Sequence, residues 1–231
     1  MTEDNKDFFY SSFLYYNHNS IVERVKYLKT CILEKCLDIV KSSYPEYDED
    51  KLDEIRYGLE AIYLSITKVV VIFFLAYLLG ILKETACLCL AFNVLRFSGF
   101  GLHATKSWMC WISSTIIFLA IPYLCTVIQL PQMLMIVLAL IFEANLLLFA
   151  PADTKKRPLI HKKKRVRWKI VTGITGCIFL YFILSTENTL VQNILLSAML
   201  IEGALINPFV YKIFKLPYNN YKTYVYSTNI N

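Results

Sequence analysis

Long apolar stretches dominate this sequence and limit the class of fold that it can adopt. Hydrophobic residues make up 56% of its 231 residues, and its mean hydropathy is +0.46. A helix that crosses a membrane needs about 20 consecutive apolar residues. Apolar stretches that meet or approach this length cover residues 61–82, 85–97, 108–130, 132–150, 170–185 and 190–206. The sequence therefore predicts an all-α polytopic membrane protein with about six membrane segments, of which residues 85–97 form a short, re-entrant or steeply packed one.

The charged residues are spread unevenly and divide the chain into three regions. Residues 1–60 hold 13 of the 18 acidic side chains, whereas residues 151–169, the basic loop, carry nine Lys or Arg against one Asp. We expect an N-terminal region over residues 1–60, one membrane domain over 61–206 and a tail over 207–231. Before the first span, apolar residues at helical spacing predict an amphipathic helix against the membrane interface or the other helices. They are Ile21, Val25, Leu28, Ile32, Cys36 and Ile39.

The basic loop predicts the orientation of the protein in the membrane. Short loops this rich in Lys and Arg stay in the cytoplasm. Six crossings then place both termini in the cytoplasm and bring His103, Lys106 and Cys110 to the cytoplasmic face. The acidic, polar start of the chain has no signal-peptide pattern, so we expect the first span to act as the insertion signal.

His103 and Cys110 form the pair of residues that most suggests chemistry. They are seven positions apart, so a straight helix would separate them by roughly 10 Å along its axis, whereas direct proton transfer needs about 3 Å. The segment Ser98-Gly99-Phe100-Gly101 predicts a break that folds His103 back over the next helix. Thr105 or Ser107 could cap that helix, and the dipole near its start favours a thiolate. The pattern indicates a cysteine nucleophile with a histidine base.

Several other polar residues are candidates for supporting roles. A third group that orients His103 or binds an oxyanion could be Asn93, Arg96, Ser98 or Ser107. Arg96 could instead neutralise a substrate carboxylate or anchor in the lipid headgroups. Glu143 and Glu202 lie inside apolar spans, where a carboxylate either serves a site or pairs between helices.

Neither a metal nor a cofactor is expected. Cys87 and Cys89 are spaced C-x-C without a second pair, and the chain has only three histidines, so a zinc site has little support. The seven cysteines are an odd number, mostly in apolar stretches, which argues against a disulfide framework. Membrane topology and attraction to anionic lipids account for the basic loop, and no nucleic-acid partner is expected.

Two motifs resemble the AgrB family of accessory gene regulator proteins, and the resemblance covers residues 20–210. One is the Ala150–Pro158 segment ahead of the basic stretch; the other is the order and spacing of Arg96, Gly101, His103, Ala104 and Cys110. The resemblance implies a bacterial membrane cysteine endopeptidase that cleaves the C-terminal part off an AgrD-type propeptide and helps make a cyclic autoinducing peptide for quorum sensing. It implies that His103 and Cys110 are catalytic and that Arg96 and Gly101 support them. Members often have a glycine pair before the histidine, and here Phe100 occupies its first position.

The implied reaction is acyl transfer through a Cys110 thioester, which a peptide thiol captures as a thiolactone or a peptide hydroxyl as a lactone. The expected partners are an AgrD-like propeptide, whose acidic end the basic loop could attract, and membrane lipids. A homodimer would bury the polar faces of the bundle.

Two alternatives to this function remain open. One is a small peptide exporter with Glu143 and Glu202 on its pathway, and the other is a non-enzymatic receptor or assembly protein.

Overall fold

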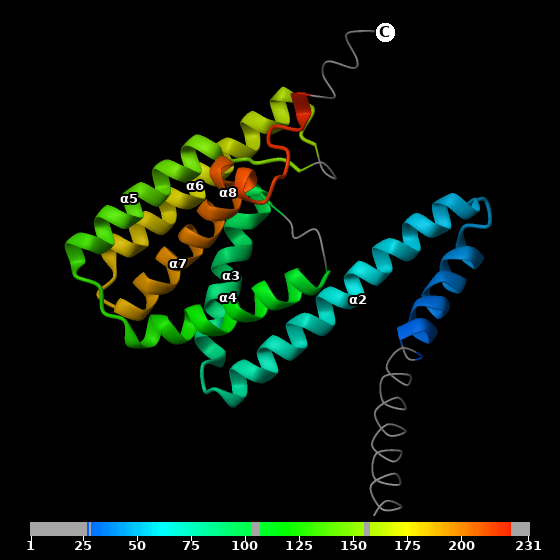
Figure 1. Cartoon of the computed structure of the whole chain (residues 1–231), viewed down its shortest axis with the longest axis horizontal. Coiled ribbons are helices and arrows are strands. Elements are labelled where there is room, and N and C mark those ends of the chain that lie inside the picture. The colour runs from blue at the N-terminus through cyan, green and yellow to red at the C-terminus, as the bar shows by residue number, and fades with distance from the viewer. Residues whose placement is uncertain (1–26, 28, 103–106, 155–157, 223–231) are drawn as a thin grey trace, which may run out of the picture. The chain divides into compact units, whose positions relative to one another are not determined.

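The computed structural model describes residues 27, 29–102, 107–154 and 158–222, and the regular structure in these ranges is helical apart from one isolated bridge (Figure 1). Five of the described helices, α2, α4, α5, α6 and α7, are long and apolar enough to cross a membrane. The predicted class, an all-α polytopic membrane protein, is confirmed. The helices are α2 (Glu49–Leu78), α3 (Leu82–Gly99), α4 (Ser107–Val127), α5 (Gln132–Phe149), α6 (Lys162–Ser185), α7 (Thr189–Ile206) and α8 (Pro208–Ile213).

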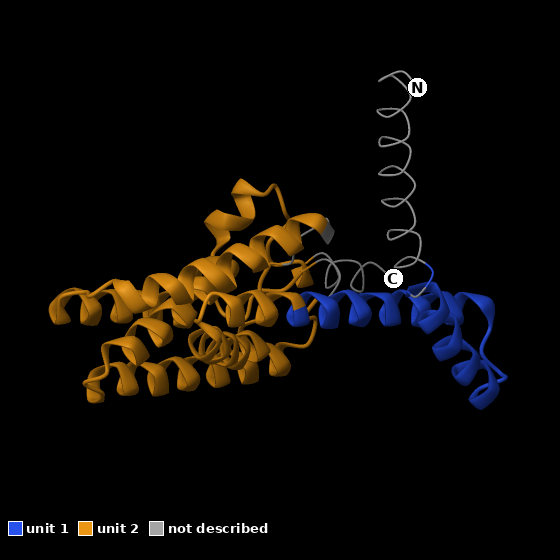
Figure 2. Ribbon diagram, turned by 90° about the horizontal axis from the view of Figure 1, so that it is seen from below, with its two compact units in different colours: residues 1–70 blue, residues 71–231 orange. Residues whose placement is uncertain are grey.

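The chain forms two compact units, residues 1–70 and 71–231, which divide inside α2 (Figure 2). In the first unit, residues 29–43 are helical, and Lys29 forms an ion pair with Glu60 of α2. This part of the predicted amphipathic helix is confirmed, but its buried residue is Leu37, which lies outside the predicted stripe. The predicted apolar residues Ile32 and Ile39 are 47% and 65% exposed.

Helix α7 is the centre of the second unit. It packs against α3, α4, α5, α6 and α8. Of the residues in its apolar stretch, 56% are buried, against 11% in α4. The core around it consists of large aliphatic side chains from several helices. Those with no exposed surface are Leu88, Leu95, Met135, Leu146, Ile183, Met199 and Ile206.

Two amides at the start of α7 fix the ends of neighbouring helices. Gln192 Nε2 donates hydrogen bonds to the carbonyl oxygens of Ile183 and Thr186 at the end of α6, both at 2.9 Å. Asn193 Nδ2 donates to the carbonyls of Cys125 and Ile128 at the end of α4, at 3.1 and 2.8 Å. These bonds satisfy carbonyl groups that a helix end leaves without partners, so α7 sets where α4 and α6 stop.

Helix α3 is longer than the predicted segment 85–97. It is a continuous helix of 18 residues, about 27 Å long at 1.5 Å per residue, and it packs against α4, α6 and α7. Lys83, Glu84 and Arg96 make it less apolar than the five candidate spans. Its buried residues recur at helical spacing and end with Ser98 and Gly99, so its last turn lies inside the bundle.

Candidate active site

The chain leaves α3 through a sharp turn of four residues, Gly99, Phe100, Gly101 and Leu102, here called the 99–102 turn. Phe100 has φ +60° and Gly101 has φ +85°, backbone conformations that side chains other than glycine rarely adopt. A Cβ atom at Gly101 would also lie 2.6 Å from Nη1 of Arg96 and 2.8 Å from the carbonyl oxygen of Leu205. The break predicted from this glycine segment is therefore present, and position 101 requires glycine.

Backbone hydrogen bonds fix the 99–102 turn on two sides. Ala152 donates to the Gly99 carbonyl at 3.0 Å and accepts from the Gly101 N–H at 2.8 Å. The Leu102 N–H donates to the carbonyl of Leu205, in the last turn of α7, at 2.8 Å. The turn is thus joined both to the segment after α5 and to the end of α7, and Leu102 is the residue directly before His103.

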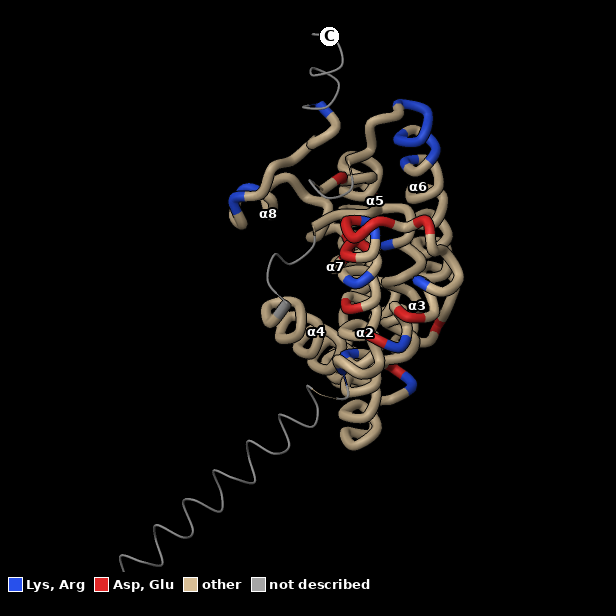
Figure 3. Tube along the Cα trace, turned by 90° about the vertical axis from the view of Figure 1, so that its right-hand side faces the viewer, with Lys and Arg blue, Asp and Glu red and all other residues tan. Residues whose placement is uncertain are grey.

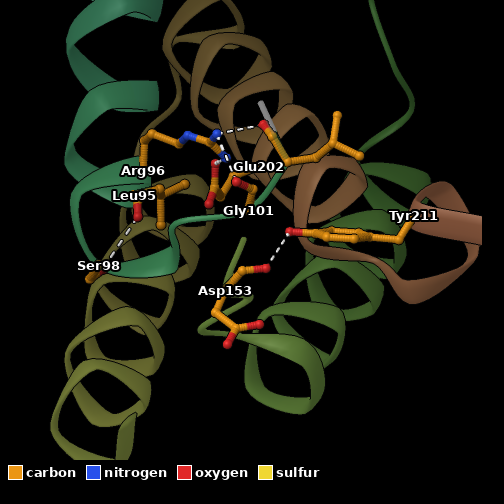
Figure 4. A network of polar contacts seen from close by, with 8 residues as sticks. Leu95, Arg96, Ser98, Gly101, Asp153, Glu202 and Tyr211 are labelled. Atoms are coloured by element: carbon orange, nitrogen blue, oxygen red, sulfur yellow. Dashed lines mark hydrogen bonds and ion pairs between the residues drawn. The ribbon is translucent and has the colours of Figure 1, made fainter. Parts of the chain in front are cut away.

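Arg96 adds side-chain hydrogen bonds to the same turn (Figure 4). Its Nη2 donates to the carbonyl oxygens of Gly101 and Leu102, at 3.1 and 2.6 Å. Its Nη1 lies 3.5 Å from Oε2 of Glu202 on α7, and the exposed fractions of the two side chains are 15% and 0%. The guanidinium therefore points into the bundle, where it joins α3, the turn and α7.

Gly99 gives Glu202 the space to reach Arg96. A Cβ atom at position 99 would collide with Oε1 of Glu202. The glycine segment therefore has two separate tasks: Gly101 allows the backbone conformation, and Gly99 admits a buried carboxylate.

Cys110 lies in the first turn of α4, which begins at Ser107. Its Sγ is 4.0 Å from Oγ of Ser114, one helical turn further on, and the side chain is half-buried. His103 and Lys106 lie outside the described residues, as does the side chain of Ser107. The structure thus fixes the chain on either side of residues 103–106.

Glu143 lies elsewhere, at the contact of α5 with α6. It is buried, accepts a hydrogen bond from Sγ of Cys177 at 3.6 Å, and occupies the space that a Cβ atom at Gly176 would fill. Both of these neighbours of Glu143 lie on α6. Its supporting role stays a prediction, and the structure shows a helix-to-helix contact.

Asp153 organises the region next to the turn. It is 3% exposed, and its carboxylate accepts hydrogen bonds from the backbone N–H groups of Asn220 and Tyr221, both at 2.8 Å. The hydroxyl of Tyr211 on α8 donates to its backbone carbonyl at 3.2 Å (Figure 4), and burial raises the pKa of that hydroxyl, which keeps it a neutral donor. Asp153 thus binds the C-terminal segment, and its chain neighbour Ala152 binds the 99–102 turn.

Basic residues gather at the start of α6 (Figure 3). Their side chains differ in exposure and contacts. Lys162, Lys163 and Lys164 are exposed. Arg165 instead donates to the carbonyls of Leu159 and Ile160, at 2.8 and 2.9 Å, and its guanidinium lies 3.8 Å from the ring centre of Tyr221. The three lysines present their charge outward, while Arg165 contacts Tyr221, whose N–H is bound by Asp153.

Sequence reasoning did not identify three of these contacts. Asp153 lies inside the Ala150–Pro158 motif, but its partners lie 67 and 68 residues further along the chain. Glu202 was recognised as a buried acid without its partner Arg96. Ser114 could have been found, since residues four apart share a helix face.

These features define a multi-pass helical membrane protein with a glycine turn fixed ahead of a half-buried cysteine at a helix start. The chain belongs to the AgrB family: the model of accessory gene regulator B matches residues 33–206. An AgrB-like protein of Clostridium acetobutylicum is 30% identical over 198 residues, which are 84% of this chain and 94% of that protein. An AgrB-like protein of Listeria monocytogenes serovar 1/2a is 32% identical over 179 residues, 77% of this chain and 87% of the relative.

Accessory gene regulator protein B of Staphylococcus carnosus is 31% identical over 169 residues, which cover 70% of this chain and 87% of that protein. No solved structure matches the chain. The resemblance stated from the two motifs is confirmed.

Proposed function

We propose that this chain is a membrane-embedded cysteine endopeptidase that cleaves an AgrD-type propeptide, with Cys110 as nucleophile and His103 as base. Family membership supports a role in processing the autoinducer of an accessory gene regulator system. The observation that carries the proposal is local: Cys110 lies in the first turn of α4, and the turn ahead of His103 is fixed by Ala152, Leu205 and Arg96. Catalytic side chains need such a rigid support.

The reaction proceeds by acyl transfer. His103 takes the thiol proton of Cys110, and the thiolate attacks the scissile carbonyl carbon of the propeptide. The tetrahedral intermediate collapses, the C–N bond breaks, and His103 returns the proton to the leaving amine. The C-terminal fragment departs and the N-terminal part remains as a thioester on Cys110. A cysteine thiol of the peptide then attacks this thioester and forms a thiolactone ring, or a serine hydroxyl forms a lactone, while Cys110 is released.

The proposed site faces the cytoplasm. The hydrogen bonds between the 99–102 turn and Ala152 place the turn beside the segment that leads into the basic residues of α6. Stretches this basic stay on the cytoplasmic side. A cytoplasmic site is also the orientation expected from the sequence.

The proposal is tested by co-expressing the chain with a candidate propeptide and following the size of the peptide. A short peptide encoded nearby with a central cysteine or serine and an acidic end is the substrate to use. Cleavage should fall to background in Cys110→Ala and His103→Ala. Cys87→Ala, which removes an exposed cysteine of α3, is the matched control and should cleave normally.

Cleavage that survives Cys110→Ala would refute the protease. Export that is lost while cleavage is intact would favour a transport role. The described contacts do not favour that second function, because Glu202 is paired with Arg96 and Glu143 packs against α6.

A further inference from the structure

We propose that Glu202, on α7, is a positioning residue for the catalytic histidine: it orients Arg96, which fixes the carbonyl groups of Gly101 and Leu102 directly before His103. The inference rests on the proposed function, because it assigns a task to Glu202 only if His103 acts as the base. It requires no contact between Glu202 and the substrate.

The burial of Glu202 is the first observation. Its side chain has no exposed surface, although α7 is long and apolar enough to cross a membrane. A buried carboxylate loses its hydration, and this cost is tolerated where an opposite charge compensates it. The opposite charge is Arg96, whose Nη1 lies 3.5 Å away. Gly99 leaves the space that this approach needs.

The shape of the guanidinium explains why a carboxylate matters at this place. Arginine presents its N–H donors in one rigid plane, so a partner at Nη1 also determines where Nη2 points. Here Nη2 reaches both carbonyls of the turn. A neutral side chain at position 202 would leave Arg96 able to rotate toward solvent, and the carbonyls of Gly101 and Leu102 would lose their side-chain donor.

Helix α7 supplies a second, independent bond to the same residue. The carbonyl of Leu205, three positions after Glu202, accepts the Leu102 N–H at 2.8 Å. The Leu102 N–H is therefore bound directly by the last turn of α7, the most buried of the five candidate spans. The Leu102 carbonyl is bound by Arg96 of α3, which pairs with Glu202 of α7. Leu102 is the described residue that directly precedes His103 in the chain.

The test compares Glu202→Gln, Arg96→Gln and the double variant for two quantities: the amount of folded protein and the cleavage kinetics. In Glu202→Gln we expect kcat to fall about 10- to 100-fold, since a displacement of 1 Å can cost about that much, with KM nearly unchanged. Arg96→Gln should also lower the folded amount, because it leaves Glu202 as an unpaired buried charge. The double variant should recover the folded amount without recovering kcat.

Glu187→Gln is the matched control, since it makes the same chemical change at an exposed position just before α7; it should leave both quantities unchanged. Wild-type kcat in Glu202→Gln, or a double variant that regains kcat together with folding, would show that the pair is only structural and overturn the inference. Cys110→Ala is measured alongside. If it still cleaves, the proposed function itself fails and the inference falls with it.

Discussion

Phe100 has a strained backbone beside the proposed site. Its φ of +60° lies in a region that costs a residue with a side chain about 1–3 kcal/mol. Its ring makes an edge-to-face contact with Trp168 on α6, with centroids 5.6 Å apart. Relatives with a glycine at this position would avoid the strain but lack the ring contact. This chain therefore combines a strained backbone with an aromatic contact.

Replacing Phe100 by glycine and by alanine separates these two effects. Both changes remove the ring, but only glycine relieves the backbone. After allowing about 0.5–1 kcal/mol for the greater chain entropy of glycine, we expect Phe100→Gly to be more stable than Phe100→Ala by about 1 kcal/mol. Thermal unfolding in detergent, followed by tryptophan fluorescence, measures the difference. An alanine variant as stable as the glycine variant would show that the turn relaxes without strain.

The sequence was informative about single residues and uninformative about their pairing. The helix break was expected from the glycines in an apolar region, and the structure contains it. The supporting roles of Arg96 and Gly101, which the family resemblance implies, stay predictions. The pairing of Arg96 with Glu202 depends on how α3 and α7 are rotated against each other. A pattern within one helix does not contain that rotation, so Gly99 could not be recognised as the space for a carboxylate.

At the scale of elements, the C-terminal segment is connected to the turn through Asp153 and Ala152. Asp153 accepts from the N–H groups of Asn220 and Tyr221, and its neighbour Ala152 pairs with Gly99 and Gly101. The chain after α8 therefore contacts the turn through two adjacent residues. The predicted tail begins at residue 207, and its described part is docked on the membrane domain.

Asp153→Asn tests this connection. An amide keeps one acceptor oxygen in place of two, so one buried N–H loses its partner, at a cost of about 1–3 kcal/mol. We expect the tail to be cut faster by trypsin after Lys215, which is exposed, and cleavage of the propeptide to fall. Loss of a C-terminal tag on a gel reports the first effect. Asp38→Asn, at an exposed position of the first unit, is the control, and equal trypsin rates in the two variants would contradict the docking.

Helix α3 shows why the length of one element could not be predicted. The predicted segment began at residue 85 because Lys83 and Glu84 interrupt the apolar pattern, and it ended at residue 97 because Ser98 and Gly99 follow. In the structure these residues belong to the helix, and Arg96 is compensated by an acid of another helix. A hydropathy scale counts every charged residue as if it faced lipid. The length of a helix is therefore underestimated where its charge is neutralised inside the bundle.

At the scale of the whole molecule, the fold class followed directly from the apolar stretches, and the orientation remains a prediction from the positive charges. The three exposed lysines at the start of α6 provide a test of what those charges do. Membrane topology and lipid attraction explain them without a specific partner, whereas attraction of an acidic propeptide end would add a direct effect on substrate binding.

Reversal of Lys162, Lys163 and Lys164 to glutamate, with Arg165 retained for its contacts with Leu159 and Ile160, distinguishes these explanations. If the lysines bind the acidic end, KM for the propeptide should rise several-fold at unchanged membrane abundance, and added salt should reduce the difference. The same reversal at Lys212, Lys215 and Lys222, exposed in the tail, controls for total charge. Undiminished cleavage, or an equal effect of both triple variants, would rule out a specific role for the lysines.

The bonds from the 99–102 turn to Leu205 and Arg96 also have a consequence for biosynthesis. The turn and Cys110 are synthesised before Glu202 and Leu205, which belong to α7. Domains generally assemble as the chain is synthesised from its N-terminus, so the contacts that hold the turn are completed only when α7 has entered the bundle. If Cys110 is the nucleophile, as proposed, a nascent chain would carry it before the turn is supported, and the order of synthesis itself would delay proteolysis until α7 is in place.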